Sequence, residues 1–162
     1  MCGIIGYIGT KKAKPILING LLRLEYRGYD SAGIATVEKD GIKVIKEKGR
    51  IANLDAMDGI NDLEGTIGIG HTRWATHGKP SAINSHPHYD NDKLFAVVHN
   101  GIIENYHDLR KFLEDNGYTF LSDTDTEVIP NLINFYYKKE NDFLKAVKLA
   151  CDELKGSFAL EI

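Results

Sequence analysis

The sequence lacks the features that mark several classes of protein. Only Cys2 and Cys151 are cysteines among 162 residues, which argues against a disulfide-stabilised scaffold and fits a reducing cytoplasm. The net charge is −3, whereas nucleic-acid binders usually carry a basic surplus. Apolar runs such as residues 94–98 are far shorter than the roughly 20 residues that span a bilayer. The first residues do not show the basic and then apolar pattern of a secretory signal peptide. We therefore expect a cytoplasmic protein without nucleic-acid or membrane partners.

Motifs for metals and common cofactors are also missing. Six histidines invite a metal site, but His86 and His88 flank a proline and lack the i, i+4 spacing of a helical zinc pair. No cysteine cluster supports them. The glycines of residues 3–9 are not followed by the turn and helix of a phosphate-binding or dinucleotide-binding motif. We expect no metal and no cofactor.

The remaining pattern is that of a globular domain with 43% hydrophobic and 27% charged residues. Period-two apolar runs predict strands, and Asp40-Gly41 predicts a tight hairpin turn. The predicted strands are 3–8, 66–71 and 93–99, with a loop from 72 to about 92. The predicted helices are 14–26, 52–58, 105–116, 125–139 and 142–155, and Cys151 is interpreted as a core residue. The final residues, GSFALEI, resemble the start of a further strand, so we expect the domain to continue beyond them.

Cys2 directly follows the initiator methionine. Aminopeptidases remove Met1 when the second residue is small, which would leave Cys2 with a free α-amine beside its thiol. An α-amine titrates in the same range as a thiol, so it can accept the thiol proton near neutral pH. This combination is the N-terminal nucleophile design. The alternative is a small, inert residue in the first strand.

Two segments could build an active site around such a nucleophile. In residues 70–78, Arg73 could bind a carboxylate with two hydrogen bonds, and Trp74 could close over a small ligand. A stacked surface pair is the alternative. In residues 97–106, the Asn100 amide and the Gly101 backbone N–H could form an oxyanion hole. An ordinary turn at the end of a strand is the alternative.

Two further polar segments allow a functional and a structural interpretation. Asp123, Asp125 and Glu127 could pair with a ligand ammonium group, or they could cap a helix. Residues 26–33 place Arg27 in a tight polar turn before a strand, which could be purely structural.

Taken in order, the segments MCGI, YRGYDSAG, GHTRWATHG, HPH, VVHNGIIENY and SDTDTEV resemble the glutaminase domain of class II glutamine amidotransferases. The match runs from residue 2 to the end of the chain, so residues 1–162 are expected to form this domain, incomplete at its C-terminus. The resemblance implies an α+β, N-terminal nucleophile hydrolase fold. That fold is a four-layer αββα sandwich of antiparallel sheets.

The resemblance also implies roles for individual residues. Cys2 would be the nucleophile with its α-amine as base, and Asn100 and Gly101 would form the oxyanion hole. Arg73 would hold the α-carboxylate of glutamine and Asp125 its α-ammonium group. The other matching residues lie on a loop that closes over glutamine (Trp74, Thr76 and His77) or support the nucleophile region (Arg27). His86 and His88 match the family without a derivable catalytic step.

The implied reaction is hydrolysis of L-glutamine to glutamate and ammonia through a Cys2 thioester. The matching segments are most similar to those of one branch of the class, which passes the ammonia to fructose 6-phosphate and makes glucosamine 6-phosphate. That step takes place on an isomerase domain that this chain lacks. Such a full-length protein is expected to be a homodimer. Two alternatives stay open: another acceptor such as phosphoribosyl pyrophosphate, or an inactive fragment if Met1 is retained.

Overall fold

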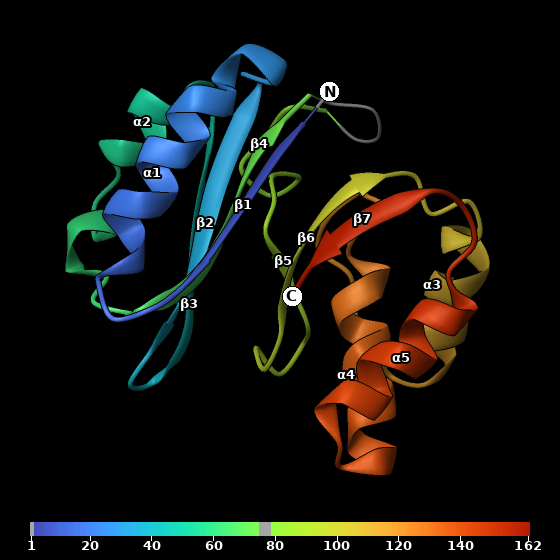
Figure 1. The fold of residues 1–162 in the computed structure, drawn as a ribbon. Helices are drawn as coiled ribbons and strands as arrows, with labels where there is room; N and C mark the ends of the chain where they lie inside the picture. The colour runs from blue at the N-terminus through green and yellow to red at the C-terminus, as the bar shows by residue number, and fades with distance from the viewer. Residues whose placement is uncertain (1, 75–78) are drawn as a thin grey trace.

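The computed structural model describes residues 2–74 and 79–162, which form two antiparallel sheets packed between two groups of helices (Figure 1). The first sheet has the order β1-β4-β2-β3 and the second the order β5-β6-β7. Their strands are β1 (Gly3–Ile8), β2 (Ser31–Glu38), β3 (Gly41–Lys48), β4 (Ile67–Arg73), β5 (His88–Tyr89), β6 (Ala96–Gly101) and β7 (Phe158–Glu161).

The helices cover the outer faces of both sheets. The first sheet is covered by α1 (Ala13–Leu24) and α2 (Ile51–Asp55), and the second by α3 (Tyr106–Asp115), α4 (Val128–Glu140) and α5 (Phe143–Glu153) (Figure 1). Two 3₁₀ turns, η1 (Glu25–Arg27) and η2 (Ile60–Asp62), complete the described elements. None of the helices within the described residues is long and apolar enough to cross a membrane.

Three separate apolar clusters correspond to the three interfaces between the four layers. One joins α1 and α2 to the first sheet, one joins α3, α4 and α5 to the second, and a smaller one lies between the sheets. The alternation of strand side chains produces this division. In β6, Val97 packs toward the helices, whereas Ala96 and Val98 pack toward the first sheet. The arrangement confirms the predicted α+β sandwich.

Three predicted details need correction. β4 continues to Arg73, past the predicted start of the loop, because Arg73 pairs with Ser31 of β2. The predicted loop contains the short strand β5, which pairs with β6. Cys151 is only half-buried, because α5 buries its two alanines instead: Ala146 and Ala150. The predicted residues Thr76 and His77 lie outside the described part of the chain.

Candidate active site

The ends of three strands bring the predicted site residues together. Gly3 of β1 pairs with Thr72 of β4, which places Cys2 beside the C-terminal end of β4. The backbone N–H of Gly3 also donates to Thr72 Oγ1 at 3.1 Å. β6 ends at the same place on the facing sheet. The result is a cavity of about 400 Å³, a size typical of small-molecule sites. Every predicted site residue that the structure describes lines it: Cys2, Arg27, Arg73, Trp74, Asn100, Gly101 and Asp125.

Cys2 is held by contacts from both sheets. The Trp74 backbone N–H donates to Cys2 Sγ at 3.2 Å, and the thiol lies 3.6 Å from the Trp74 carbonyl oxygen. From the second sheet, Asn100 Nδ2 donates to the Cys2 carbonyl oxygen at 3.3 Å. Cys2 and the Asn100 amide therefore share one cavity, as a nucleophile and an oxyanion donor must.

Arg73 and Asp125 place opposite charges in the same cavity. Both residues are buried, each with only 4% of its surface exposed. Burial lowers the pKa of the Arg73 guanidinium group, while the nearby carboxylates of Asp30 and Asp125 oppose that shift. Asp125 Oδ2 accepts the Ile103 backbone N–H at 2.8 Å. A buried cation and a buried anion in one cavity suit a zwitterionic ligand.

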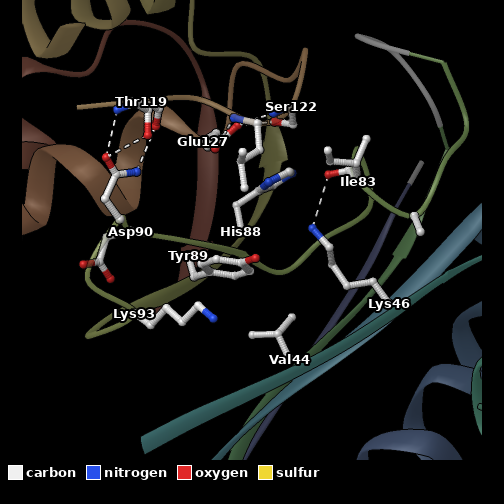
Figure 2. A pocket seen from close by; sticks show the side chains of 13 residues that line it. Val44, Lys46, Ile83, His88, Tyr89, Asp90, Lys93, Thr119, Ser122 and Glu127 are labelled. Atoms are coloured by element: carbon white, nitrogen blue, oxygen red, sulfur yellow. Dashed lines mark hydrogen bonds between the residues drawn. The ribbon is translucent and has the colours of Figure 1, made fainter. Parts of the chain in front are cut away.

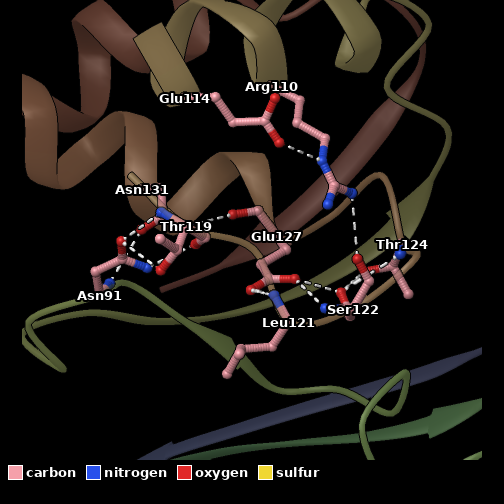
Figure 3. Close-up of polar contacts among 9 residues, drawn as sticks. All are labelled: Asn91, Arg110, Glu114, Thr119, Leu121, Ser122, Thr124, Glu127 and Asn131. Atoms are coloured by element: carbon pink, nitrogen blue, oxygen red, sulfur yellow. Dashed lines mark hydrogen bonds and ion pairs between the residues drawn. The ribbon is translucent and has the colours of Figure 1, made fainter. Parts of the chain in front are cut away.

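The segment before α4 is held by Glu127, which fixes the turn that carries Asp125 (Figure 3). The Glu127 carboxylate accepts the Leu121 N–H at 2.9 Å, the Ser122 N–H at 2.7 Å and the Ser122 hydroxyl at 2.6 Å. Arg110 donates to the Ser122 carbonyl oxygen at 3.2 Å. Glu127 does occupy the N-cap position of α4, but its carboxylate, like that of Asp125, accepts backbone N–H groups outside the helix. The helix itself begins at Val128.

Four histidines near this site are buried: His71, His86 and His99, which line the cavity, and His88, which lines a neighbouring one. Burial lowers the pKa of each imidazole, that of His71 to about 4. The rings of His71 and His86 stack with centroids 4.1 Å apart. His99 Nδ1 lies 2.9 Å from Thr126 Oγ1. Among the described residues, no group of three or more histidine, cysteine or acidic residues is arranged to hold a metal.

The turn that contains Arg27 packs against the end of β4. A Cβ on Gly28 would lie 2.7 Å from the Arg73 carbonyl carbon, so only glycine allows this approach. Trp74, 49% exposed, makes an edge-to-face contact with Tyr29, with centroids 5.5 Å apart. This contact places the indole at the mouth of the cavity.

A larger cavity of about 610 Å³ lies beside the second sheet (Figure 2). Lys46 and His88 line it, and Lys46 Nζ donates to the Ile83 carbonyl oxygen at 3.2 Å. Burial lowers the pKa of Lys46 to about 8. The nucleophile and the amide donor lie in the smaller cavity, which we therefore take as the candidate active site.

Sequence reasoning assigned no role to His71, although His71 also lines the cavity. The available signal was its position two residues before Arg73. Alternate residues of a strand share a face, so both side chains point to the same side of β4.

Gly101 lies where β6 and β7 pair, and substituting it tests how closely these two strands approach each other. Its φ is +125°, and a Cβ would lie 2.2 Å from the Ser157 carbonyl oxygen. Gly41 has a similar φ of +119°, but a Cβ there would meet nothing within 4 Å. Gly101→Ala should therefore lower the free energy of unfolding by about 1–3 kcal/mol more than Gly41→Ala. Chemical denaturation measures the difference, and equal losses would show that Ser157 does not crowd this position.

Comparisons with known proteins agree with this geometry. The profile of a family described as "Glutamine amidotransferase domain" matches residues 71–162. A protein from Clostridium perfringens, named glutamine–fructose-6-phosphate aminotransferase (isomerizing), is 60% identical over the whole chain, and a Bacteroides thetaiotaomicron protein of the same name is 53% identical. The chain spans about a quarter of the length of these relatives, 26% and 27% respectively.

Solved structures also superpose on this chain, at a lower sequence identity than these relatives. The glutamine phosphoribosylpyrophosphate amidotransferase from Bacillus subtilis superposes with a TM-score of 0.81 and 28% identity, over 99% of this chain and 34% of that chain. A structure titled as the allosteric regulatory enzyme of purine biosynthesis gives a TM-score of 0.83, with the same identity and coverage.

Proposed function

This chain belongs to the glutamine amidotransferase domain family, and from that premise we propose that it hydrolyses L-glutamine to glutamate and ammonia. We propose that residues 1–162 belong to one glutaminase domain. The observation that carries the proposal is the shared cavity, in which the Cys2 thiol, the Asn100 amide and the charges of Arg73 and Asp125 meet. A generic amidase would need the first two groups, whereas glutamine also needs partners for its α-carboxylate and α-ammonium groups.

The reaction begins once removal of Met1 has freed the α-amine of Cys2. The amine takes the thiol proton, and the sulphur attacks the side-chain carboxamide carbon of glutamine. Asn100 and the Gly101 N–H donate to the oxyanion of the tetrahedral intermediate. The protonated amine then gives its proton to the departing nitrogen, so ammonia leaves and a Cys2 thioester remains. Water attacks the thioester, glutamate leaves and the thiol is regenerated.

Other parts of the cavity orient the substrate. Arg73 binds the α-carboxylate and Asp125 the α-ammonium group, while Trp74 covers the bound amino acid and Arg27 supports the turn beside the nucleophile. We propose that Thr76 and His77, which follow Trp74 in the sequence, also take part in binding glutamine.

We further propose that the ammonia is transferred to fructose 6-phosphate, giving glucosamine 6-phosphate in a longer, homodimeric protein. The support is the name shared by relatives that are 53–60% identical to this chain. The phosphoribosylpyrophosphate amidotransferase is only 28% identical, so phosphoribosyl pyrophosphate is the weaker candidate acceptor. A catalytic thiol that must remain reduced favours a cytoplasmic location.

The proposed hydrolysis is tested by measuring ammonia and glutamate released from L-glutamine by the purified protein. Equal amounts of the two products support the proposal. Asparagine is the matched substrate, since it has the same charged groups and a side chain one methylene shorter. Absence of ammonia release from protein that lacks Met1 would contradict the proposed function.

Arg73→Ala and Asp125→Asn should each raise the Michaelis constant for glutamine strongly. Each leaves one charge of the zwitterion without its buried partner, a loss of about 2–5 kcal/mol for desolvated pairs. Because these contacts are the same in the bound substrate and the transition state, kcat should change less. Arg73→Lys should also weaken binding, because it keeps the charge but loses the paired N–H donors.

Steady-state kinetics with two substrates separate this role from general damage. Glutamine analogues without the α-carboxylate should react equally well with the wild type and Arg73→Ala. Unchanged Michaelis constants for glutamine in both Arg73→Ala and Asp125→Asn would contradict the proposed pocket.

A further inference from the structure

His71 contacts two oxygen atoms beside the nucleophile. It lies on β4, is 1% exposed, and its Nε2 is 2.9 Å from Asn100 Oδ1 and 3.2 Å from the His99 carbonyl oxygen. Carbonyl and amide oxygens only accept hydrogen bonds, so Nε2 must carry a proton to satisfy either of them.

The remaining surroundings favour the neutral ring with its proton on Nε2. Within the described part of the chain, His71 Nδ1 has no hydrogen-bond partner, which a lone pair tolerates better than a buried N–H would. Burial is the main cause that lowers the pKa of His71 to about 4; the nearby His99 and Arg73 act in the same direction, and the hydrogen bonds to Asn100 and to the His99 carbonyl oxygen oppose it. His86, stacked on the ring with an interplanar angle of 14°, fixes the plane of the imidazole.

This tautomer determines how the Asn100 amide is turned. With Oδ1 bound to His71, the NH₂ group faces Cys2, whose carbonyl oxygen accepts from Nδ2 at 3.3 Å. A rotated amide would place Oδ1 against the Cys2 carbonyl oxygen and would turn its NH₂ group toward the Nε2–H of His71. Both contacts would be repulsive, so the hydrogen bonds allow one orientation.

We propose that His71 is a positioning residue that holds the Asn100 amide with its NH₂ group toward the oxyanion. The inference rests on the proposed function, since it assigns a purpose to the oxyanion donor of that reaction. His71 contributes through Asn100 and makes no direct contribution to proton transfer.

The kinetic test compares His71→Leu, His71→Gln and the double variant His71→Leu with Asn100→Ala. His71→Leu should lower kcat roughly 10²-fold without raising the Michaelis constant for glutamine, because the oxyanion loses an oriented donor. His71→Gln should recover much of that loss, since its amide nitrogen can donate from near the Nε2 position. The double variant should be no slower than Asn100→Ala alone, because both substitutions remove the same interaction.

His88→Leu is the matched control for loss of a buried imidazole. His88 is as buried as His71, but its Nε2 contacts Thr124 Oγ1 at 3.1 Å. It should lose stability to a similar extent and keep most of kcat. Additive losses in the double variant, or a loss of kcat in His88→Leu as large as in His71→Leu, would overturn the inference.

Nitrogen-15 spectra of labelled histidine test the tautomer independently of activity. We expect His71 to be neutral, with its proton on Nε2, at pH 7. A proton on Nδ1 with Nε2 unprotonated would overturn the inference even in a fully active protein. Absence of glutamine hydrolysis by the wild type would instead contradict the proposed function, and the spectra would still decide the state of His71.

Discussion

Cys2→Ala should abolish glutamine hydrolysis. Without the sulphur no thioester can form, and the remaining groups of the cavity can only bind and polarise the amide. The loss should exceed the roughly 10²–10³-fold effect of removing a single oxyanion donor. Glutamine binding should persist, because Arg73 and Asp125 remain in place. Ammonia release and calorimetric binding measure the two effects separately.

Two variants control for this result. Cys2→Ser retains an oxygen nucleophile that is far less reactive than a thiolate, so it should show little or no turnover. Cys151→Ala removes the other cysteine, which is equally free and lies half-buried on α5. Cys151→Ala should leave turnover unchanged. Wild-type turnover in Cys2→Ala would mean that another group attacks glutamine.

Asn100→Ala should lower kcat about 10²–10³-fold, with a much smaller change in the Michaelis constant. The negative charge that Asn100 stabilises is present in the tetrahedral intermediate and absent from bound glutamine, so the substitution affects the transition state selectively. Steady-state kinetics over a range of glutamine concentrations gives both constants.

Asn105→Ala is the matched control for loss of a carboxamide. The Asn105 amide donates to the Glu153 carbonyl oxygen at 2.9 Å and accepts the Lys155 N–H at 2.9 Å, so its bonds are structural. This variant should lose stability and retain kcat. If Asn100→Ala changed only the Michaelis constant, the Asn100 amide would be a substrate-binding group and the proposed oxyanion hole would be wrong.

The elements with strong local signals could be predicted from the sequence. The predicted hairpin of β2 and β3 is present, but its two turn residues are Lys39 and Asp40, one position before the predicted pair, because Gly41 already belongs to β3 and pairs with Glu38. The end of β4 was less predictable. Arg73 has no local preference that extends the strand, and its pairing with Ser31 depends on a segment about 40 residues earlier in the chain.

The resemblance to a known family predicted which residues form the site. It did not predict the hydrogen bonds that hold those residues in place. Cys2, Arg73, Asn100 and Asp125 stand in segments whose chemistry suggests a role. The bond between His71 and Asn100 joins β4 to β6 across the two sheets, and such a contact depends on how the layers pack. The same is true of Glu127, which stands at the start of α4 as the sequence indicates, but whose carboxylate holds the preceding turn.

The mass of the N-terminal peptide, from protein quenched with acid during glutamine turnover, shows whether Cys2 is the N-terminal nucleophile. We expect a peptide that begins at Cys2, lacks Met1 and carries one glutamyl group on that cysteine. The glutamyl group should disappear when glutamine is exhausted. An active protein that retains Met1, or a glutamyl group attached to a different residue, would contradict the assignment of Cys2 as the N-terminal nucleophile.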